Sequence, residues 1–479
     1  MSLGHVPILR AGRPYRSLER VVLRDVRNGE PVAEVSQANR GLIARDLAGM
    51  DARAQSLREM TAADLGAISA RAADLYARAE LPLDDGTTQS PDQYLAQLSA
   101  TTGMPLALCR GNMGKIESVL RRVTSVVEGW TRGIDPAVLD RGWVMEGGRR
   151  VSFRAEAAAL GAVLPNNSPG VHGLWAPALA LKYPLVLRPG RQEPWTPLRI
   201  VRAMMAAGAP ESAFSFYPSD HSGGIEVLLR CGRSMVFGDE GTLRPWKDDP
   251  RVQLHGPGWS KVILDEAACA EFEKHLDVIV ASIADNGGRS CLNTSGVFVA
   301  SRGRVIAEAL AERLAAIEPL PMDDPKARLA AFAEPAVAHR VSAHIDSLLQ
   351  APGAVDLSAR TRGICRIEQV DGCTFLRPTV VHCEDPDHPL ARAEYLFPFA
   401  AVVEVPEDDL AARIGPTLVA TAIVSDGPLR RALAGSTSID RLNLGPIPTS
   451  RIDWDQPHEG NLFDHLYRRR AVQIDDAAA

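Results

Sequence analysis

Short apolar strands alternate with helical segments between residues 161 and 264, and this alternation constrains the fold more than any other feature. The expected strands lie at 162–164, 184–187, 214–217, 234–237 and 261–264, and the expected helices at 173–181, 197–207 and 223–229. Strands separated by helices pair in parallel, so the segment predicts a doubly wound α/β sheet. In such sheets ligands bind beyond the carboxyl ends of the strands, which makes the loops after each strand the first places to search.

A second α/β block follows the first. Its strands are expected at 297–300, 400–405 and 417–424, and its helices at 269–284, 306–317 and 326–349. The chain has 479 residues, which is too long for one ordinary core. We therefore expect two large domains, preceded by a helical region at about 40–132.

Two segments lie outside these blocks. Strands expected at 143–146 and 149–153 flank Gly147-Gly148, a pair suited to a type I′ hairpin turn. A two-stranded ribbon is marginally stable alone, so we expect it to pack on another surface, for instance a second subunit. The tail ends with Arg468-Arg469-Arg470 and an expected strand at 471–473, and its composition indicates an arm that docks elsewhere.

Charge and cysteine content exclude several classes of protein. The formal net charge is −6 with both signs interspersed, whereas a nucleic-acid-binding protein normally has a basic face. No apolar run approaches the roughly 20 residues that cross a bilayer, and no signal peptide is apparent. Seven cysteines form no Cys-x-x-Cys pair, so neither a zinc site nor a disulfide framework is indicated. We expect a cytoplasmic protein without a metal whose partners are small molecules.

One cysteine occupies an unusual position. Cys291 lies in the stretch Asp285-Asn286-Gly287-Gly288-Arg289-Ser290-Cys291-Leu292-Asn293, behind a Gly-Gly turn and just before an apolar strand. A thiol on such a bend is held out of the core, where backbone N–H groups stabilise the nucleophilic thiolate. A buried, unreactive cysteine is the alternative that this pattern leaves open.

An asparagine follows the first expected strand. Asn167 stands in a loop bracketed by Pro165 and Pro169. A fixed amide beside a backbone N–H suits the oxyanion that forms when a thiolate attacks a carbonyl. An ordinary Asn-rich turn is the structural alternative.

Polar residues and glycines also follow the second and fourth strands. Arg188 and Glu193 follow the second strand and suit the adenosine ribose of a dinucleotide, although a solvated surface pair explains them equally well. Gly238, Gly241 and Thr242 follow the fourth strand, where glycines permit close approach of a pyrophosphate to a helix N-terminus. The acidic pair at 239–240 is unfavourable for such an anion.

Taken in order, these segments resemble the aldehyde dehydrogenase superfamily over roughly residues 100 to 460. The motifs are the proline-bracketed Asn loop, Arg188-Pro189-Gly190, the glycine loop at 238, Gly256-Pro257-Gly258, Asn-Gly-Gly-Arg-Ser-Cys, Arg377-Pro378-Thr379 and Glu394-Tyr395-Leu396-Phe397-Pro398-Phe399. The resemblance implies an α/β fold with a Rossmann-type cofactor domain (1–140 and 155–264), an oligomerisation hairpin (141–154), a catalytic domain (265–445) and a C-terminal arm (446–479). It also implies NAD or NADP as cofactor and a homodimer or homotetramer.

The resemblance assigns roles to individual residues. Cys291 takes the place of the nucleophile and Asn167 that of the oxyanion donor. Arg188 replaces the usual lysine near the adenosine ribose, and Glu394 with Phe397 matches the segment at the nicotinamide ribose, one residue longer than in the family. The candidate cofactor-binding residues are thus Pro165, Arg188, Glu193, Gly238, Gly241, Thr242, Gly256, Glu394 and Phe397.

The segment after the glycine loop departs from the hydrolytic members of the family. Those members carry Glu-Leu-Gly-Gly-Lys, whose glutamate activates water, whereas this chain reads Leu254-His255-Gly256-Pro257-Gly258-Trp259-Ser260-Lys261. The segment is closer to that of CoA-acylating aldehyde dehydrogenases and acyl-CoA reductases, which release the acyl group to a thiol. CoA is therefore expected as a co-substrate, with an aldehyde or an acyl-CoA as substrate.

Two alternatives remain at this point. A hydrolytic aldehyde dehydrogenase would need another base, and a neutral imidazole at His255 suits that role near pH 7. A non-catalytic member of the same fold is indicated by Asp239, Glu240 and the missing Gly-Lys pair. Retention of Cys291 and Asn167 favours catalysis.

Overall fold

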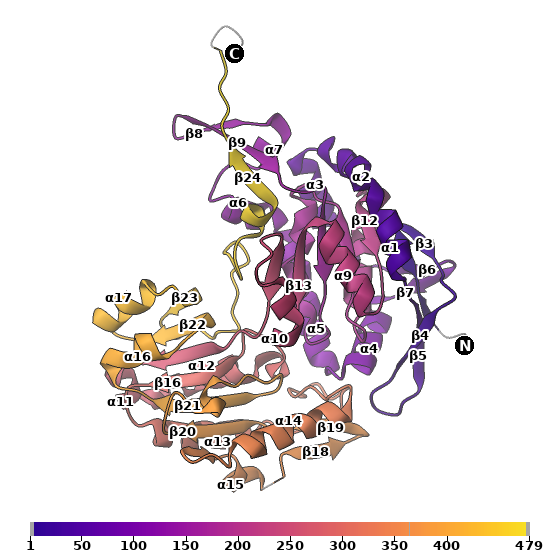
Figure 1. The fold of residues 1–479 in the computed structure, drawn as a ribbon. Coiled ribbons are helices and arrows are strands. Elements are labelled where there is room, and N and C mark those ends of the chain that lie inside the picture. Colours follow the sequence, from indigo (N-terminus) through magenta and orange to yellow (C-terminus); the bar gives the residue numbers. More distant parts are fainter. Residues whose placement is uncertain (1–3, 364, 476–479) are drawn as a thin grey trace.

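The computed structural model describes residues 4–363 and 365–475, which form two lobes (Figure 1). One lobe is built on a seven-stranded sheet whose strands follow one another in the order β14, β13, β10, β11, β12, β2 and β3. Their bounds are Val252–His255, Gly232–Phe237, Ala159–Val163, Leu185–Arg188, Phe214–Phe216, Ile8–Arg10 and Arg13–Tyr15. The first five strands are parallel, and β2 joins the edge antiparallel.

This strand order confirms the predicted α/β fold and locates a switch point. The chain runs outward from β10 through β11 to β12, and then returns to place β13 and β14 on the other side of β10. The strand predicted at 261–264 forms, but not in this sheet. The position next to β13 is taken by β14, and the predicted strand belongs to the second sheet. In a doubly wound sheet the crevice at the switch point is the expected ligand site, here between β10 and β13.

Helices cover both faces of this sheet. They are α1 (Arg40–Asp46), α2 (Met50–Arg58), α3 (Ala62–Arg78), α4 (Pro91–Thr102), α5 (Leu106–Arg121), α6 (Val123–Trp130), α8 (Trp195–Ala206), α9 (His221–Arg230) and the short α10 (Glu240–Leu243). The prediction of an α-helix at 173–181 is wrong. The helix is replaced by two 3₁₀ segments, η2 (Pro169–Gly173) and η3 (Ala176–Leu179), because prolines interrupt the α-helical hydrogen-bond ladder.

The other lobe is built on a second seven-stranded sheet, ordered β17, β20, β21, β16, β15, β22 and β23. The bounds are Ala354–Asp356, Thr379–Cys383, Phe399–Glu404, Thr294–Val299, Ser260–Leu264, Thr417–Ile423 and Ile439–Leu444. All are parallel except β17. The helices of this lobe include α12 (Leu276–Ala284), α13 (Gly303–Ala315), α14 (Pro335–Leu348), α16 (Glu407–Arg413) and α17 (Pro428–Ala434).

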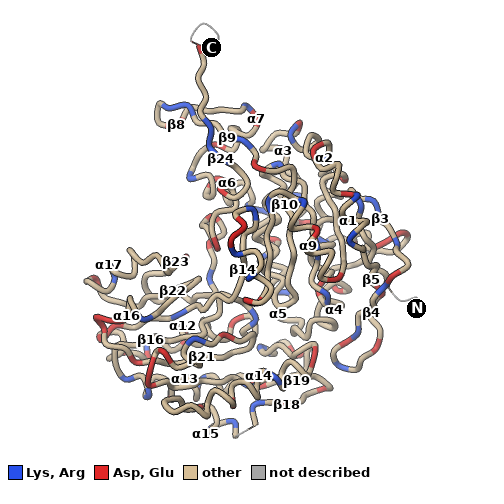
Figure 2. The backbone as a smooth tube through the Cα atoms, in the orientation of Figure 1, with Lys and Arg blue, Asp and Glu red and all other residues tan. Residues whose placement is uncertain are grey.

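The predicted hairpin forms, and its partner belongs to the same chain. Strands β8 (Val144–Glu146) and β9 (Arg149–Ala155) meet at Gly147 and Gly148, which both have positive φ, as a type I′ turn requires. The tail adds β24 (Tyr467–Arg470), which pairs with β9. The strand predicted at 471–473 therefore lies earlier in the chain, at 467–470, and includes the three arginines. Figure 2 shows blue segments around the labels β8, β9 and β24, where these arginines lie.

The tail crosses from one lobe to the other before it reaches this sheet (Figure 1). The carbonyl oxygen of Asp455 lies so close to Gly129 that a Cβ there would sit 2.2 Å away, and the Trp454 ring covers Gly173 in the same manner. Glycine at both positions lets the tail pack directly on backbone. From here on, the C-terminal arm means residues 446–466, the part of the predicted arm at 446–479 that precedes β24.

Candidate active site

A cavity of about 700 Å³ opens at the carboxyl ends of β10, β11, β13 and β14. Its size is typical of a small-molecule or cofactor site, and its position is the switch point of the first sheet. The predicted site residues that line it are Pro165, Asn167, Arg188, Gly238, Thr242, His255, Gly256, Cys291 and Glu394.

The loop before Cys291 is bent by three residues in the left-handed region. Asn286, Gly287 and Gly288 have φ of 55°, 67° and 69°. A Cβ at Gly288 would lie 2.4 Å from the carbonyl carbon of Phe397, so only glycine fits there. The Asn286 side chain donates to Ser168 Oγ at 2.9 Å and accepts from the Asn112 amide at 2.6 Å. These contacts hold the cysteine loop against the Asn167 loop.

Cys291 forms part of the wall of two cavities. Besides the large one, it lines a small cavity of about 40 Å³, whose lining combines polar residues, among them Lys115, Asp285 and His458, with the apolar side chains of Val171, Leu174, Leu292, Ile452 and Trp454. Two of these apolar side chains belong to the C-terminal arm. The nucleophile candidate thus borders both a cofactor-sized space and a small one.

The thiol of Cys291 is protonated at neutral pH. Burial and the nearby Glu394 carboxylate raise the pKa of this thiol to about 12. The backbone N–H groups of Cys291 and Leu292 lower this pKa, as expected of the loop, but burial outweighs them. Reaction at this sulfur requires a group that accepts its proton.

Glu394 lines the same cavity as Cys291 and is the carboxylate that affects its pKa. It accepts hydrogen bonds from the N–H groups of Gly258 at 3.2 Å and Trp259 at 2.5 Å. Gly258 in turn packs on the backbone of Cys291. Burial raises the pKa of Glu394 to about 7, so this carboxyl group gains and loses its proton near neutral pH.

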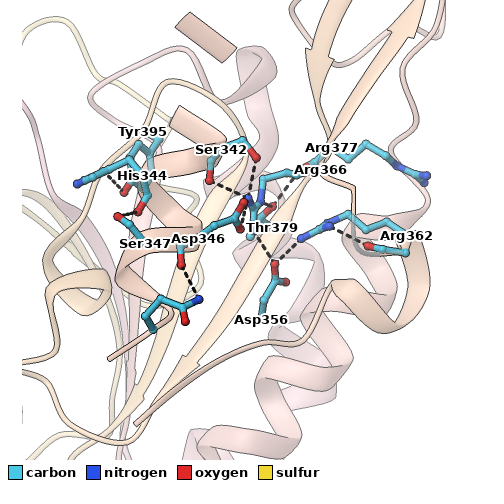
Figure 3. A network of polar contacts seen from close by, with 12 residues as sticks. Ser342, His344, Asp346, Ser347, Asp356, Arg362, Arg366, Arg377, Thr379 and Tyr395 are labelled. Carbon is cyan, nitrogen blue, oxygen red and sulfur yellow. Dashed lines mark hydrogen bonds and ion pairs between the residues drawn. The ribbon is translucent and has the colours of Figure 1, made fainter. Parts of the chain in front are cut away.

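Neighbouring residues fix the segment that carries Glu394. The hydroxyl group of Tyr395 lies 2.9 Å from His344 Nδ1 on α14, and Figure 3 shows the pair beside a polar network centred on Arg366. In that network Arg366 donates to Thr379 Oγ1 at 3.1 Å and pairs with Asp346 and Asp356. Thr379 belongs to the predicted Arg377-Pro378-Thr379 motif and begins β20, so this motif supports the site without lining it.

Lys261 holds the turn at Gly258 and Trp259, whose N–H groups bind Glu394. Its buried ammonium group donates to the carbonyl oxygens of Trp259 at 2.6 Å and Pro416 at 2.8 Å, and to Thr417 Oγ1 at 3.0 Å. Burial lowers the pKa of Lys261 to about 7. Trp259 itself has a φ of 43°, a conformation uncommon for a bulky residue.

Asn167 reaches the cysteine loop as predicted. Its Nδ2 group donates to the carbonyl oxygen of Arg289, two residues before Cys291, at 2.9 Å. Because an amide nitrogen carries two hydrogens, the second remains for a ligand in the cavity. The geometry suits an oxyanion donor.

His255 ends β14 and is buried between an aromatic ring and the C-terminal arm. Its ring stacks on Phe237 with centroids 4.4 Å apart, and its Nδ1 atom contacts the Glu459 carboxylate. Burial and the neighbouring His458 and His465 lower the pKa of His255 well below its usual range. The imidazole is therefore neutral.

Arg188 lines the cavity and, in the described ranges, keeps one donor unpaired. Its Nη2 group donates to the carbonyl oxygen of Ser219 at 2.9 Å, whereas its buried Nε atom has no hydrogen-bond partner within the described residues. Gly238 also lines the cavity and makes room for Thr242, because a Cβ at position 238 would lie 2.7 Å from Thr242 Cβ. Asp239 caps α10 by accepting from Thr242 N–H at 2.8 Å, which accounts for an acid in a glycine loop.

Three predicted cofactor residues do not line the cavity. Glu193 is buried and accepts from Thr196 N–H at 2.8 Å, and its other oxygen lies 2.7 Å from His172 Nε2, so it is not available to a ribose. Gly241 lies within α10. Phe397 packs in the core of the second lobe, and the exposed Leu396 takes the place expected for it.

Sequence reasoning missed Arg289 and Glu334, two charged residues of the cavity lining. Arg289 lines the cavity over the ring of Phe332, with 4.9 Å between guanidinium carbon and ring centroid. It donates to the carbonyl oxygen of Ala331, and burial lowers its pKa to about 10. The sequence did offer a signal for this residue, because Arg289 stands directly before Ser290-Cys291 in the cysteine motif.

Two negative findings apply to residues 4–363 and 365–475. No group of three or more His, Cys, Asp or Glu side chains there is arranged to hold a metal ion. No helix in those ranges is long and apolar enough to span a membrane.

Comparisons with known proteins agree with this geometry. A family model described as the aldehyde dehydrogenase family matches residues 16–415. The aminoacetaldehyde dehydrogenase of Pseudomonas aeruginosa is 28% identical over 313 residues, which are 60% of this chain and 58% of that protein. The chain thus spans less than two thirds of that relative's length.

Solved structures share the fold at low sequence identity. PnpE from Pseudomonas sp. WBC-3 has a TM-score of 0.79 at 17% identity, over 98% of this chain and 97% of the other. Succinate-semialdehyde dehydrogenase from Burkholderia pseudomallei has a TM-score of 0.76 at 20% identity, over 97% of both chains. Together with the family match, the fold and the cysteine loop confirm the resemblance: the chain belongs to the aldehyde dehydrogenase family, a family of oxidoreductases.

Proposed function

We propose that this protein is an NAD(P)-dependent aldehyde dehydrogenase that acts through Cys291 and passes the acyl group to CoA. The observation that carries the proposal is the position of Cys291 in the wall of both cavities. The large cavity suits the cofactor and the acyl acceptor, and the apolar side chains of the small one suit the aldehyde chain. The reverse reaction, reduction of an acyl-CoA, uses the same site.

The residues around the large cavity fit a nicotinamide dinucleotide. Arg188, whose Nε atom is unpartnered among the described residues, supplies a cation, and Gly238 and Thr242 line the same cavity. When bound, such a cofactor supplies the acceptor for the hydride that leaves the substrate carbon. Cys291 forms part of the wall of the same cavity.

The chain's own residues then divide the remaining chemistry. Glu394 takes the proton of the Cys291 thiol, whose sulfur attacks the aldehyde carbon. The Asn167 amide, with a backbone N–H of the cysteine loop, holds the oxyanion, and such a donor is worth about 3–4 kcal/mol of barrier. Cys291 holds the substrate carbon first as a thiohemiacetal and then as a thioester.

The Gly256-Pro257-Gly258 segment favours CoA as the acyl acceptor. It contributes backbone and no carboxylate to the cavity, at the place where hydrolytic relatives carry their water-activating glutamate. A thiol acceptor needs no such carboxylate, because a thiol ionises far more readily than water.

Glu394 favours hydrolysis as the second candidate. Its carboxyl group lines the same cavity and has a pKa of about 7, which suits a general base for water. The two candidates share every step up to the thioester and differ only in what removes the acyl group.

The small cavity favours short aliphatic aldehydes. Its volume is about 40 Å³, and the Trp454 ring closes one side. Longer or aromatic chains require that side chain to move.

Absorbance at 340 nm tests the proposal. Purified protein is mixed with NAD or NADP and with short, long and aromatic aldehydes, with and without CoA. Signal that depends on CoA and is strongest with short aldehydes is the expected result. Signal of equal rate without CoA favours hydrolysis, and absence of signal in both directions contradicts the proposal.

A further inference from the structure

The C-terminal arm brings a carboxylate to His255, one of the residues that line the large cavity. Glu459 stands 204 residues after His255 in the chain, yet its Oε2 atom contacts Nδ1 of that imidazole. The arm is held there by its own backbone, because Gln253 on β14 donates to the carbonyl oxygen of Glu459. Gln253 and His255 are two residues apart and so lie on the same face of β14. Both side chains on this face contact Glu459.

The contact bears on which imidazole nitrogen is available. Nδ1 and the Glu459 Oε2 atom touch without hydrogen-bond geometry, and Nε2 likewise has no hydrogen-bond partner in the part of the chain that the structure describes. A carboxylate beside Nδ1 favours the tautomer with its proton on Nδ1, which leaves the lone pair on Nε2. The ring is only 4% exposed and lines the cavity with Cys291.

Two aromatic rings lie nearly parallel to this imidazole. Phe237 stacks on it with an angle of 16° between planes, and the ring of His458 in the arm lies 6.5 Å away, centroid to centroid, at an angle of 15°. A buried histidine with a carboxylate beside one nitrogen and an unpartnered second nitrogen has the arrangement of a general base.

We infer that His255 accepts the proton of the incoming acyl acceptor and that Glu459 of the C-terminal arm is its positioning residue. This inference rests on the proposed function, because it concerns release of the acyl group from Cys291. Nε2 takes the proton of the CoA thiol while that sulfur bonds to the thioester carbon. The bond from this carbon to the Cys291 sulfur breaks, and the cysteine leaves as a thiolate that the imidazolium reprotonates.

The test separates release of the acyl group from its formation. His255→Ala and Glu459→Gln are mixed with aldehyde, NAD(P) and CoA, quenched, and analysed for an acyl group on Cys291 by mass spectrometry, beside the steady-state rate. We expect both variants to accumulate acyl-Cys291 during turnover. The rate should fall about 100-fold or more for His255→Ala and about 10-fold to 100-fold for Glu459→Gln.

A matched control addresses docking of the arm. Asp464 pairs with Arg132 through exposed side chains elsewhere on the same arm, so Asp464→Asn weakens an arm contact without touching His255 and should keep the full rate. Added imidazole should restore part of the His255→Ala rate, which a packing defect would not allow. His255→Asn replaces His255→Ala if the latter does not fold.

Contradicting results are distinct for the two claims. A lower rate without accumulated acyl-Cys291, or an unchanged rate in both variants, overturns the role of His255 and Glu459. Failure of the unaltered protein to form acyl-Cys291 when CoA is omitted overturns the proposed function instead.

Discussion

The backbone of Gly258 packs directly on that of Cys291: a Cβ at Gly258 would lie 2.0 Å from the carbonyl oxygen of Cys291 and 3.2 Å from its Cβ. The same glycine donates its N–H to Glu394. One residue without a side chain therefore joins the proposed nucleophile to the carboxylate that we propose takes its proton.

Gly258→Ala should displace the cysteine loop. The added methyl group would overlap a backbone carbonyl that no side-chain rotation can move, so we expect destabilisation of about 1–3 kcal/mol and a large loss of turnover. Thermal unfolding and aldehyde oxidation measure the two effects. Gly111→Ala is the control, because a Cβ there meets open space on α5, and it should leave activity unchanged. Normal activity of Gly258→Ala would contradict the contact.

Asn167→Ala should lower turnover by about two to three orders of magnitude, because it removes one oxyanion donor. The fold should persist, since the lost hydrogen bond to the Arg289 carbonyl oxygen is a single one. Asn166 is the neighbouring control, because its side chain accepts from Gln192 N–H instead, and its alanine variant should lose far less. Equal losses in the two variants would argue against a specific role for Asn167.

The reactivity of Cys291 should follow the ionisation of Glu394. The thiol has a pKa of about 12 and the carboxyl group one of about 7, so the rate of alkylation by iodoacetamide should rise as pH increases through about 7. Glu394→Gln should abolish this rise and leave alkylation to increase only at much higher pH. Glu334→Gln, at an exposed carboxylate on the cavity rim, should keep the original profile. A rise near pH 7 that survives in Glu394→Gln would exclude this carboxylate as the proton acceptor.

The same carboxyl group should make stability depend on pH. Its pKa is raised from 4.5 to about 7 in the folded protein, so the folded state binds the proton more tightly than the unfolded state. This contribution is fully present below pH 4.5 and is lost as pH rises towards 7. Glu394→Gln should remove that loss, which urea unfolding at pH 5 and pH 8 would detect; an unchanged pH dependence would contradict the burial of an ionisable group here.

Local patterns predicted the parts of the site that local sequence determines. The glycines before Cys291 and the prolines around Asn167 dictate backbone shape directly, and both loops lie where they were expected. The prediction that Glu193 binds a ribose is wrong, because its carboxylate accepts the N–H of Thr196 in the first turn of α8. Helix capping and ribose binding both use a carboxylate, so the residue type alone does not distinguish them.

Long-range pairing could not be predicted in the same way. The strand at 260–264 has the apolar pattern of either sheet, and only its pairing with β16 and β22 assigns it to the second. Glu459 looks like an ordinary residue of a polar tail until the fold places it beside His255. The resemblance to a family gave no position for either, because both depend on how distant segments pack.

The mass of the protein, quenched after mixing with a short aldehyde and NAD(P) in the absence of CoA, tests the central claim most directly. The account predicts a mass increase equal to one acyl group, located on the peptide that contains Cys291 and absent from Cys291→Ala. Formation of NAD(P)H at a sustained rate by Cys291→Ala, or with an acyl group on another residue, would contradict it.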